Sequence, residues 1–114
     1  MTLNDDHALP DRVAWALEAC RALQRQCLQA TAVEARTADF EQLQAAFERL
    51  LELMTALSPE YEHQGRVVLT RIQSQLPEVW PHVDRRLLWF FGGDCLHFLS
   101  DEEIAAFQAA EDDA

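Results

Sequence analysis

The sequence predicts an all-α protein, a small helical bundle with four main helices and a short C-terminal fifth helix. The chain has 114 residues, and strong helix formers such as Ala, Leu, Glu, Gln and Arg dominate it. Glycine occurs only 3 times and proline 4 times. Apolar residues recur at spacings of three and four, so they share one face of a helix. We expect a single helical domain over residues 1–114, with flexible ends at residues 1–8 and 111–114.

The first two helices are predicted to pack against each other. The first begins at Pro10, a residue type favoured at the first helical position. Thr37 caps the second helix, whose first turn is acidic. Residues 33–38 are expected to form the turn between them, and one continuous helix through residues 30–40 is the alternative. A stripe of small residues on the first helix can accept a stripe of bulky residues on the second; the two stripes are Val13, Ala16, Cys20, Leu23, Cys27, Ala30 and Phe40, Leu43, Phe47, Leu50, Met54, Leu57.

Prolines mark the third and fourth predicted helices. Ser58 and Pro59 open the third helix, and Pro77 ends it. Gly65 lies on its apolar face, where it either lets another helix approach closely or marks a frayed first turn. Pro81 is expected to start the fourth helix, the most buried of the set because it is apolar around most of its circumference. The apolar residues of these two helices are Tyr61, Val68, Ile72, Leu76 and Val83, Leu87, Phe90, Phe91.

The fifth helix has the clearest start signal. Gly92 and Gly93 end the helix before it, since glycine readily adopts the left-handed conformation of a helix C-terminus. Ser100 and Glu103 have the spacing of a capping box. Leu99 and Ile104 flank this cap as a hydrophobic staple, and Phe107 continues the apolar face.

Charge and targeting signals exclude several function classes. The formal net charge is −11, all nine basic residues are arginine, and none follows Arg86. Direct binding to nucleic acid or to an anionic membrane is therefore not expected, whereas a basic protein partner would fit. The N-terminus lacks the pattern of a signal peptide, and no apolar run is long enough to span a bilayer. The three cysteines have no CxxC spacing and indicate reduced thiols in the cytoplasm.

One short segment contains residue types that bind metals. Asp94, Cys95 and His97 follow the two glycines, and Glu60 with His63 has the Glu-x-x-His spacing of carboxylate-bridged di-iron bundles. The di-iron pattern needs two such motifs and two more buried glutamates, and here Asp94-x-x-His97 would be an imperfect second copy that lies in a loop. We therefore interpret the segment as a corner with a small buried cysteine, and we predict no catalytic, cofactor or metal site. A metal or a reactive thiol there is the alternative.

Aromatic residues are concentrated in the same half of the chain. The interface candidates are Trp80, Trp89, Phe90 and Phe91, because a bundle this small can hardly cover every face of the fourth helix. The sequence thus favours a small acidic cytoplasmic bacterial protein that acts through protein contacts, as an adaptor or regulator, and forms a homodimer. Two alternatives stay open: a protein that sequesters a basic partner, as DNA mimics and anti-activators do, and a helical bundle that binds a metal or another ligand.

Overall fold

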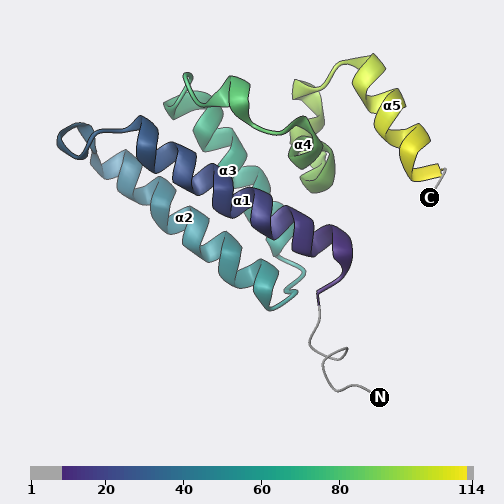
Figure 1. Cartoon of the computed structure of the whole chain (residues 1–114), viewed down its shortest axis with the longest axis horizontal. Coiled ribbons are helices and arrows are strands. Elements are labelled where there is room, and N and C mark those ends of the chain that lie inside the picture. Colours follow the sequence, from purple (N-terminus) through teal and green to yellow (C-terminus); the bar gives the residue numbers. More distant parts are fainter. Residues whose placement is uncertain (1–8, 113–114) are drawn as a thin grey trace.

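Helices make up the fold, as the sequence predicts. The computed structural model describes residues 9–112, and this part contains five α-helices and three short 3-10 helices with no strand (Figure 1). Of the expected flexible ends 1–8 and 111–114, residues 1–8 and 113–114 lie outside the described residues. None of the described helices is both long and apolar enough to cross a membrane. The α-helices are α1 (Asp11–Ala30), α2 (Ala38–Thr55), α3 (Tyr61–Gln75), α4 (Arg85–Phe91) and α5 (Asp101–Asp112), and the 3-10 helices are η2 (Val33–Ala35), η3 (Trp80–His82) and η4 (Gly93–Phe98).

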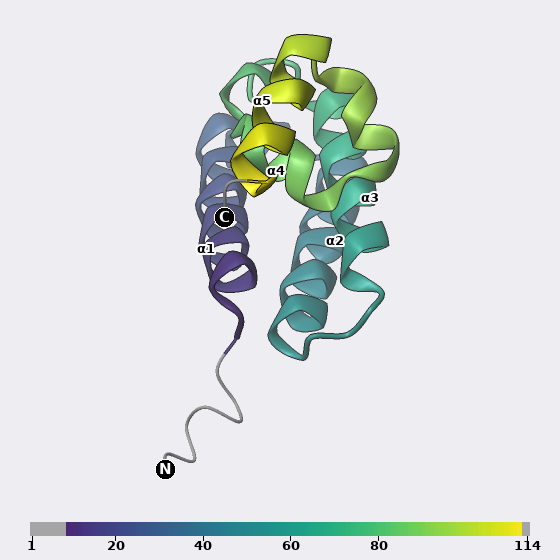
Figure 2. The same ribbon diagram turned by 90° about the vertical axis from the view of Figure 1, so that its right-hand side faces the viewer.

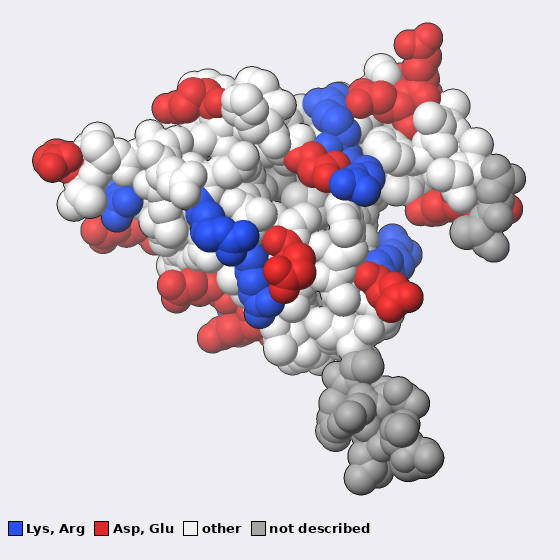
Figure 3. Space-filling view, in the orientation of Figure 1, with Lys and Arg blue, Asp and Glu red and all other residues white. Residues whose placement is uncertain are grey.

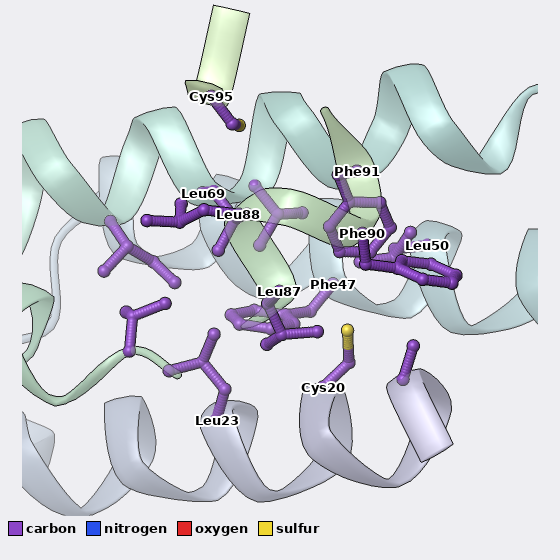
Figure 4. Close-up of a cluster of buried hydrophobic side chains, with 14 of the residues drawn as sticks. Cys20, Leu23, Phe47, Leu50, Leu69, Leu87, Leu88, Phe90, Phe91 and Cys95 are labelled. Carbon is purple, nitrogen blue, oxygen red and sulfur yellow. The ribbon is translucent and has the colours of Figure 1, made fainter. Parts of the chain in front are cut away.

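Three long helices form a scaffold, and the short α4 fills its open side. Helix α2 packs against both α1 and α3, while α4 also contacts α1 and α3 (Figure 1). The close-up shows α4 between α1 and α3, with its side chains directed among those of the long helices (Figure 4). The small bundle of four helices followed by a short C-terminal fifth is therefore confirmed, although α4 has only seven residues. Four of the seven are nevertheless buried: Leu87, Leu88, Phe90 and Phe91.

The hairpin of α1 and α2 follows the prediction closely. A turn containing η2 separates the two helices, so the alternative of one continuous helix is wrong. The Thr37 hydroxyl accepts a hydrogen bond from the Phe40 amide at 3.2 Å, which is the expected cap. Helix α1 begins at Asp11, with Pro10 in the flanking cap position instead of the first helical position. The small residues Ala16 and Cys27 and the bulky Phe47 are all fully buried, as the complementary stripes require.

Helix α2 ends in a backbone conformation that the sequence did not indicate. Leu57 has a φ of 55°, in the left-handed region. The Ser58 amide donates to the Leu53 carbonyl at 2.9 Å, and the Leu57 amide donates to the Met54 carbonyl at 3.1 Å. These two bonds define a Schellman motif with leucine in the position that glycine usually takes. Leu57 was expected in the buried stripe, but the motif turns it outward and 44% of it is exposed.

Both proline-marked helices start later than predicted. Ser58 and Pro59 form a turn, and α3 begins at Tyr61. Pro81 lies in η3, after which Val83 becomes extended and is buried. Helix α4 begins only at Arg85, because the Asp84 carboxylate accepts a hydrogen bond from the Arg86 amide at 2.9 Å and so caps the helix there. The Asp84 cap and the buried Val83 thus determine where α4 starts, whereas Pro81 does not.

Gly65 provides a close helix approach, which is the first of the two predicted roles. It is buried on α3, and a methyl group in its place would overlap the ring of Phe91 on α4. The aromatic ring therefore occupies the space that a side chain on α3 would need. This contact fixes how deeply α4 inserts between α1 and α3.

Helix α5 leaves the scaffold and lies at one side of it (Figures 1 and 2). The capping box is confirmed: the Glu103 amide donates to the Ser100 hydroxyl at 3.1 Å, and the Ser100 amide donates to the Glu103 carboxylate at 2.9 Å. Helix α5 continues through Glu111 and Asp112, where the sequence suggested a loose tail. None of its described residues is buried, so it attaches to the body through a few side chains only.

Candidate functional site: an aromatic groove beside the Gly-Gly corner

The Gly-Gly segment is a corner in the backbone. Gly92 and Gly93 have φ values of 62° and 57°, which strongly favour glycine. The Gly92 amide donates to the Leu88 carbonyl at 3.0 Å and closes α4, and the Cys95 amide donates to the Gly92 carbonyl at 3.1 Å. The chain then enters η4, which leads to α5. The two glycines therefore allow η4 to begin at Gly93, only two residues after α4 ends at Phe91.

The corner separates the sequence-predicted metal candidates. Cys95 is fully buried, and its sulfur is directed toward the core (Figure 4), whereas Asp94 and His97 are exposed. Glu60 precedes α3 and lies 3.8 Å from the Arg49 guanidinium. His63 and Asp94 do line one shallow cleft. Within residues 9–112, no group of three or more His, Cys, Asp and Glu side chains is arranged to hold a metal ion.

The three cysteines are free and buried. Burial raises the pKa of Cys20 to about 12 and that of Cys27 to about 11, because a thiolate is poorly solvated in the core. Burial is also the main cause that raises the pKa of Cys95, against the opposing charge of Arg66. A thiol with a raised pKa is a weak nucleophile at neutral pH, so these side chains are suited to packing.

The four interface candidates have different environments. Phe91 is 2% exposed and Phe90 8% exposed, so both belong to the core. Phe90 stacks on Tyr61 with ring centroids 5.9 Å apart. Trp80 and Trp89 are half-buried, and Trp80 meets Phe98 edge-on at 4.9 Å. Only the two tryptophans of this set therefore offer part of their surface to solvent.

Trp89 is part of a groove that sequence reasoning did not identify. The groove lies between the start of α1, α4 and the end of α5, and its volume is about 260 Å³. Its surface is mostly apolar. Trp15 could not be predicted as a groove residue, because it lies outside the apolar stripe of α1 and no local sequence pattern connects it with α5. The residues that line the groove are Arg12, Trp15, Arg86, Trp89, Phe90, Phe107, Ala110 and Glu111.

Aromatic stacking forms the α5 side of the groove. The rings of Trp89 and Phe107 are nearly parallel, at an interplanar angle of 17° and a centroid distance of 5.7 Å. The Trp89 indole nitrogen also donates a hydrogen bond to the Glu111 carboxylate at 2.6 Å. Phe107 and Glu111 are one helical turn apart, so Trp89 contacts one face of α5 twice.

Arginine side chains cover the opposite side of the groove. The Arg86 guanidinium lies 4.7 Å from the centre of the Trp15 ring, and the Arg12 guanidinium lies 5.1 Å from the centre of the Phe90 ring. Such cation–π contacts place positive charge at an aromatic surface without removing it from water. The groove thus combines aromatic surface with arginine on one edge and Glu111 on the other.

Arg85 holds the base of α5. Its guanidinium donates to both carboxylate oxygens of Glu103, at 2.8 and 2.9 Å, and to the Phe98 carbonyl at 2.6 Å. The Arg85 hydrogen bond, aided by that of the Ser100 amide, lowers the pKa of Glu103 from 4.5 to about 2. One residue of α4 therefore binds the end of η4 and the start of α5 together.

A family assignment follows from comparison with known proteins. No curated protein matches the chain, and no solved structure matches it. The model of a family described as PA2817-like matches residues 9–114, which include every residue of the bundle and of the groove. The chain therefore belongs to the PA2817-like family.

Proposed function

We propose that the protein acts through protein contacts, as an adaptor or regulator, and that it forms a homodimer through the aromatic groove. The observation that carries this proposal is the pair of half-buried tryptophans, Trp15 and Trp89, in one mostly apolar groove with arginines at its edge. Tryptophan and arginine are enriched at protein interfaces and among the residues that dominate binding energy.

A second copy of the chain is the proposed occupant, because the charges on the two sides of the groove are opposite. Arg12 and Arg86 lie on the α1 and α4 side, and the Arg86 guanidinium is also paired with the Asp84 carboxylate at 2.8 Å, so Arg12 is the main source of positive charge there. Helix α5 carries no basic residue, and acidic atoms gather toward its two ends, while basic atoms with acidic neighbours lie over the adjoining body (Figure 3). In a two-fold dimer each acidic α5 would meet the arginine edge of the other copy, and the contact would form twice. The acidic residues of α5 are Asp101, Glu102, Glu103, Glu111 and Asp112.

The proposed setting is the cytoplasm of a bacterium. Three free cysteines without a disulfide fit a reducing compartment. The exclusive use of arginine among the nine basic residues, with abundant alanine and leucine, suggests a GC-rich genome.

Light scattering on a sizing column tests the dimer. Wild-type protein should elute as a dimer, and Trp15→Ala should be mainly monomeric, because it removes one aromatic wall of the groove. Trp15 also packs against the core, so the fold of this variant has to be verified separately. Val33→Ser is the matched control, since Val33 is 69% exposed and lies outside the groove; this variant should remain a dimer. Melting curves followed by circular dichroism verify that each variant is folded. A wild-type monomer at high protein concentration would contradict the dimer.

A second candidate function is the sequestration of a basic partner. It is favoured by the exposed acidic residues of α5 and by the lack of any basic residue after Arg86. Here the acidic surface of α5, and not the groove, would make the contact. The two functions differ in how strongly salt weakens them: exposed charge pairs, which both contacts use, are screened, whereas the apolar contacts of the groove, which only the dimer uses, are not.

A further inference from the structure

A second concave surface of the protein has a different chemistry from the groove. It is a shallow cleft of about 420 Å³ between α3 and the start of η4. The α3 residues that line it recur at spacings of three and four, so they form one strip along the helix. Its polar lining residues are His63, Arg66, Thr70, Arg71, Gln75 and Asp94.

The charge of the cleft is opposite to that of the whole chain. Two arginines and a histidine line it, against one acidic residue, Asp94. The chain as a whole has a net charge of −11. Positive groups gathered in a concave surface raise the local potential and concentrate anions there. The same groups disfavour a metal cation, although His63 and Asp94 face this cleft.

Arg66 is held in place before any ligand arrives. Its Nη1 atom donates to the Phe91 carbonyl at 2.6 Å. Its side chain also lies against the backbone at Gly93, where an added Cβ would come within 2.7 Å of the Arg66 Cδ and 2.9 Å of its Nε. A guanidinium has five N–H donors, and this contact uses one of them. Because the side chain is already ordered, a ligand that binds to it loses little further conformational entropy.

We propose that this cleft binds a small molecule through an oxyanion group, a carboxylate or a phosphate. Arg66 and Arg71 are the primary donors, because guanidinium groups form paired hydrogen bonds with such oxyanions. The Thr70 hydroxyl and the His63 ring supply further donors beside them. Asp94 on the η4 side selects a ligand whose other end carries a hydrogen-bond donor, and it disfavours a second anionic group there.

The experiment is a titration followed by two-dimensional amide NMR, with inorganic phosphate in one arm and acetate in the other. Sodium chloride of equal ionic strength is the reference. A saturable shift of amides in residues 63–75 and 92–95 is expected with at least one of the two oxyanions. The arm with the tighter binding identifies the group as phosphate or carboxylate.

Arg71→Gln provides the variant, because Arg71 makes no side-chain hydrogen bond among those found in residues 9–112 and its loss should leave the fold intact. Its affinity for the oxyanion should fall about tenfold or more, as the loss of a charge-assisted hydrogen bond requires. Arg25→Gln on α1 has the same charge change outside the cleft and should bind as the wild type does. The proposal is overturned if neither oxyanion gives saturable shifts, if chloride gives the same shifts, or if Arg71→Gln binds with unchanged affinity.

Discussion

The backbone of Leu57 has a conformation that leucine disfavours and that hydrogen bonds of neighbouring residues impose. A left-handed conformation costs an L-residue with a side chain roughly 1–2 kcal/mol, yet Leu57 has a φ of 55°. The two Schellman hydrogen bonds at the end of α2 impose this conformation. The heptad-like spacing of α2 predicted a buried leucine here, because spacing contains no information on where a helix stops.

Leu57→Gly should therefore stabilise the protein. Glycine adopts the left-handed conformation without a steric penalty, and because Leu57 is 44% exposed, its replacement removes less apolar burial than the loss of a core leucine would. We expect a gain of about 0.5–1 kcal/mol in the free energy of unfolding, measured by urea denaturation. Ala56→Gly is the control, because Ala56 has a φ of −84° and should gain nothing. A lower stability of Leu57→Gly than of wild type would show that the leucine side chain makes contacts that outweigh the strain.

At the scale of elements, α5 differs from the four helices that precede it. It has no buried residue and is held by Trp89 near its end and by Arg85 at its start. Local signals determined that α5 exists and where it begins, since Ser100 and Glu103 form their capping box within four residues. The position of α5 depends on Arg85, which is 18 residues away from Glu103.

Arg85→Gln should loosen α5 while the scaffold stays folded. Hydrogen exchange of the α5 amides should become faster, because the two charge-assisted bonds to Glu103 are lost. Arg21→Gln removes an exposed pair with Glu18 within α1 and should leave α5 exchange unchanged. Equal exchange of α5 in Arg85→Gln and wild type would contradict the role given to Arg85.

The ion pair of Arg85 and Glu103 makes the attachment of α5 depend on pH. Because the pKa of Glu103 is lowered to about 2 in the folded protein, its carboxylate stabilises the folded state above the unfolded value of 4.5. This contribution is lost as the pH falls from 4.5 toward 2. An NMR titration of the Glu103 carboxyl should have its midpoint near 2 in wild type, and the midpoint should rise toward 4.5 in Arg85→Gln.

At the scale of the whole molecule, the surface combines a strong negative charge with two local exceptions. The aromatic groove has arginines at one edge, and the cleft beside α3 contains two more. The net charge of −11 is a sum over the whole chain and does not show where arginines gather. Composition alone could therefore only indicate an acidic protein. Because the aromatic groove and the acidic surface of α5 are different parts of the molecule, a contact at one can be tested apart from a contact at the other.

Salt should distinguish the two candidate functions. If the groove makes the contact, the dimer should persist when sodium chloride is raised from about 0.1 M to 1 M, where the screening length shortens from ~10 to ~3 Å. If the acidic surface of α5 binds a basic partner, a pull-down should lose that partner over the same range. Sedimentation velocity of the purified protein at both salt concentrations measures the first outcome. Dissociation of the dimer at 1 M would mean that charge, and not apolar contact, holds it.

Local sequence patterns predict the helical class, the Gly-Gly corner and the start of α5, and they favour a turn between α1 and α2 over one continuous helix. Each of these depends on residues within about one or two helical turns, such as Thr37 with Phe40 or Ser100 with Glu103. The starts of α3 and α4 were wrong, because a proline marks where a helix can begin and the competing Asp84 cap determined where α4 does begin.

The packing of the helices determines which aromatic residues reach the surface and which side chains surround them. Phe91 and Trp89 are two positions apart on one short helix, yet one fills the space above Gly65 and the other stacks on Phe107. Trp15 joins Trp89 in the groove although the two residues are 74 positions apart in the sequence. Periodicity assigns a residue to a face of its own helix, whereas the partner of that face depends on the way the helices pack against one another.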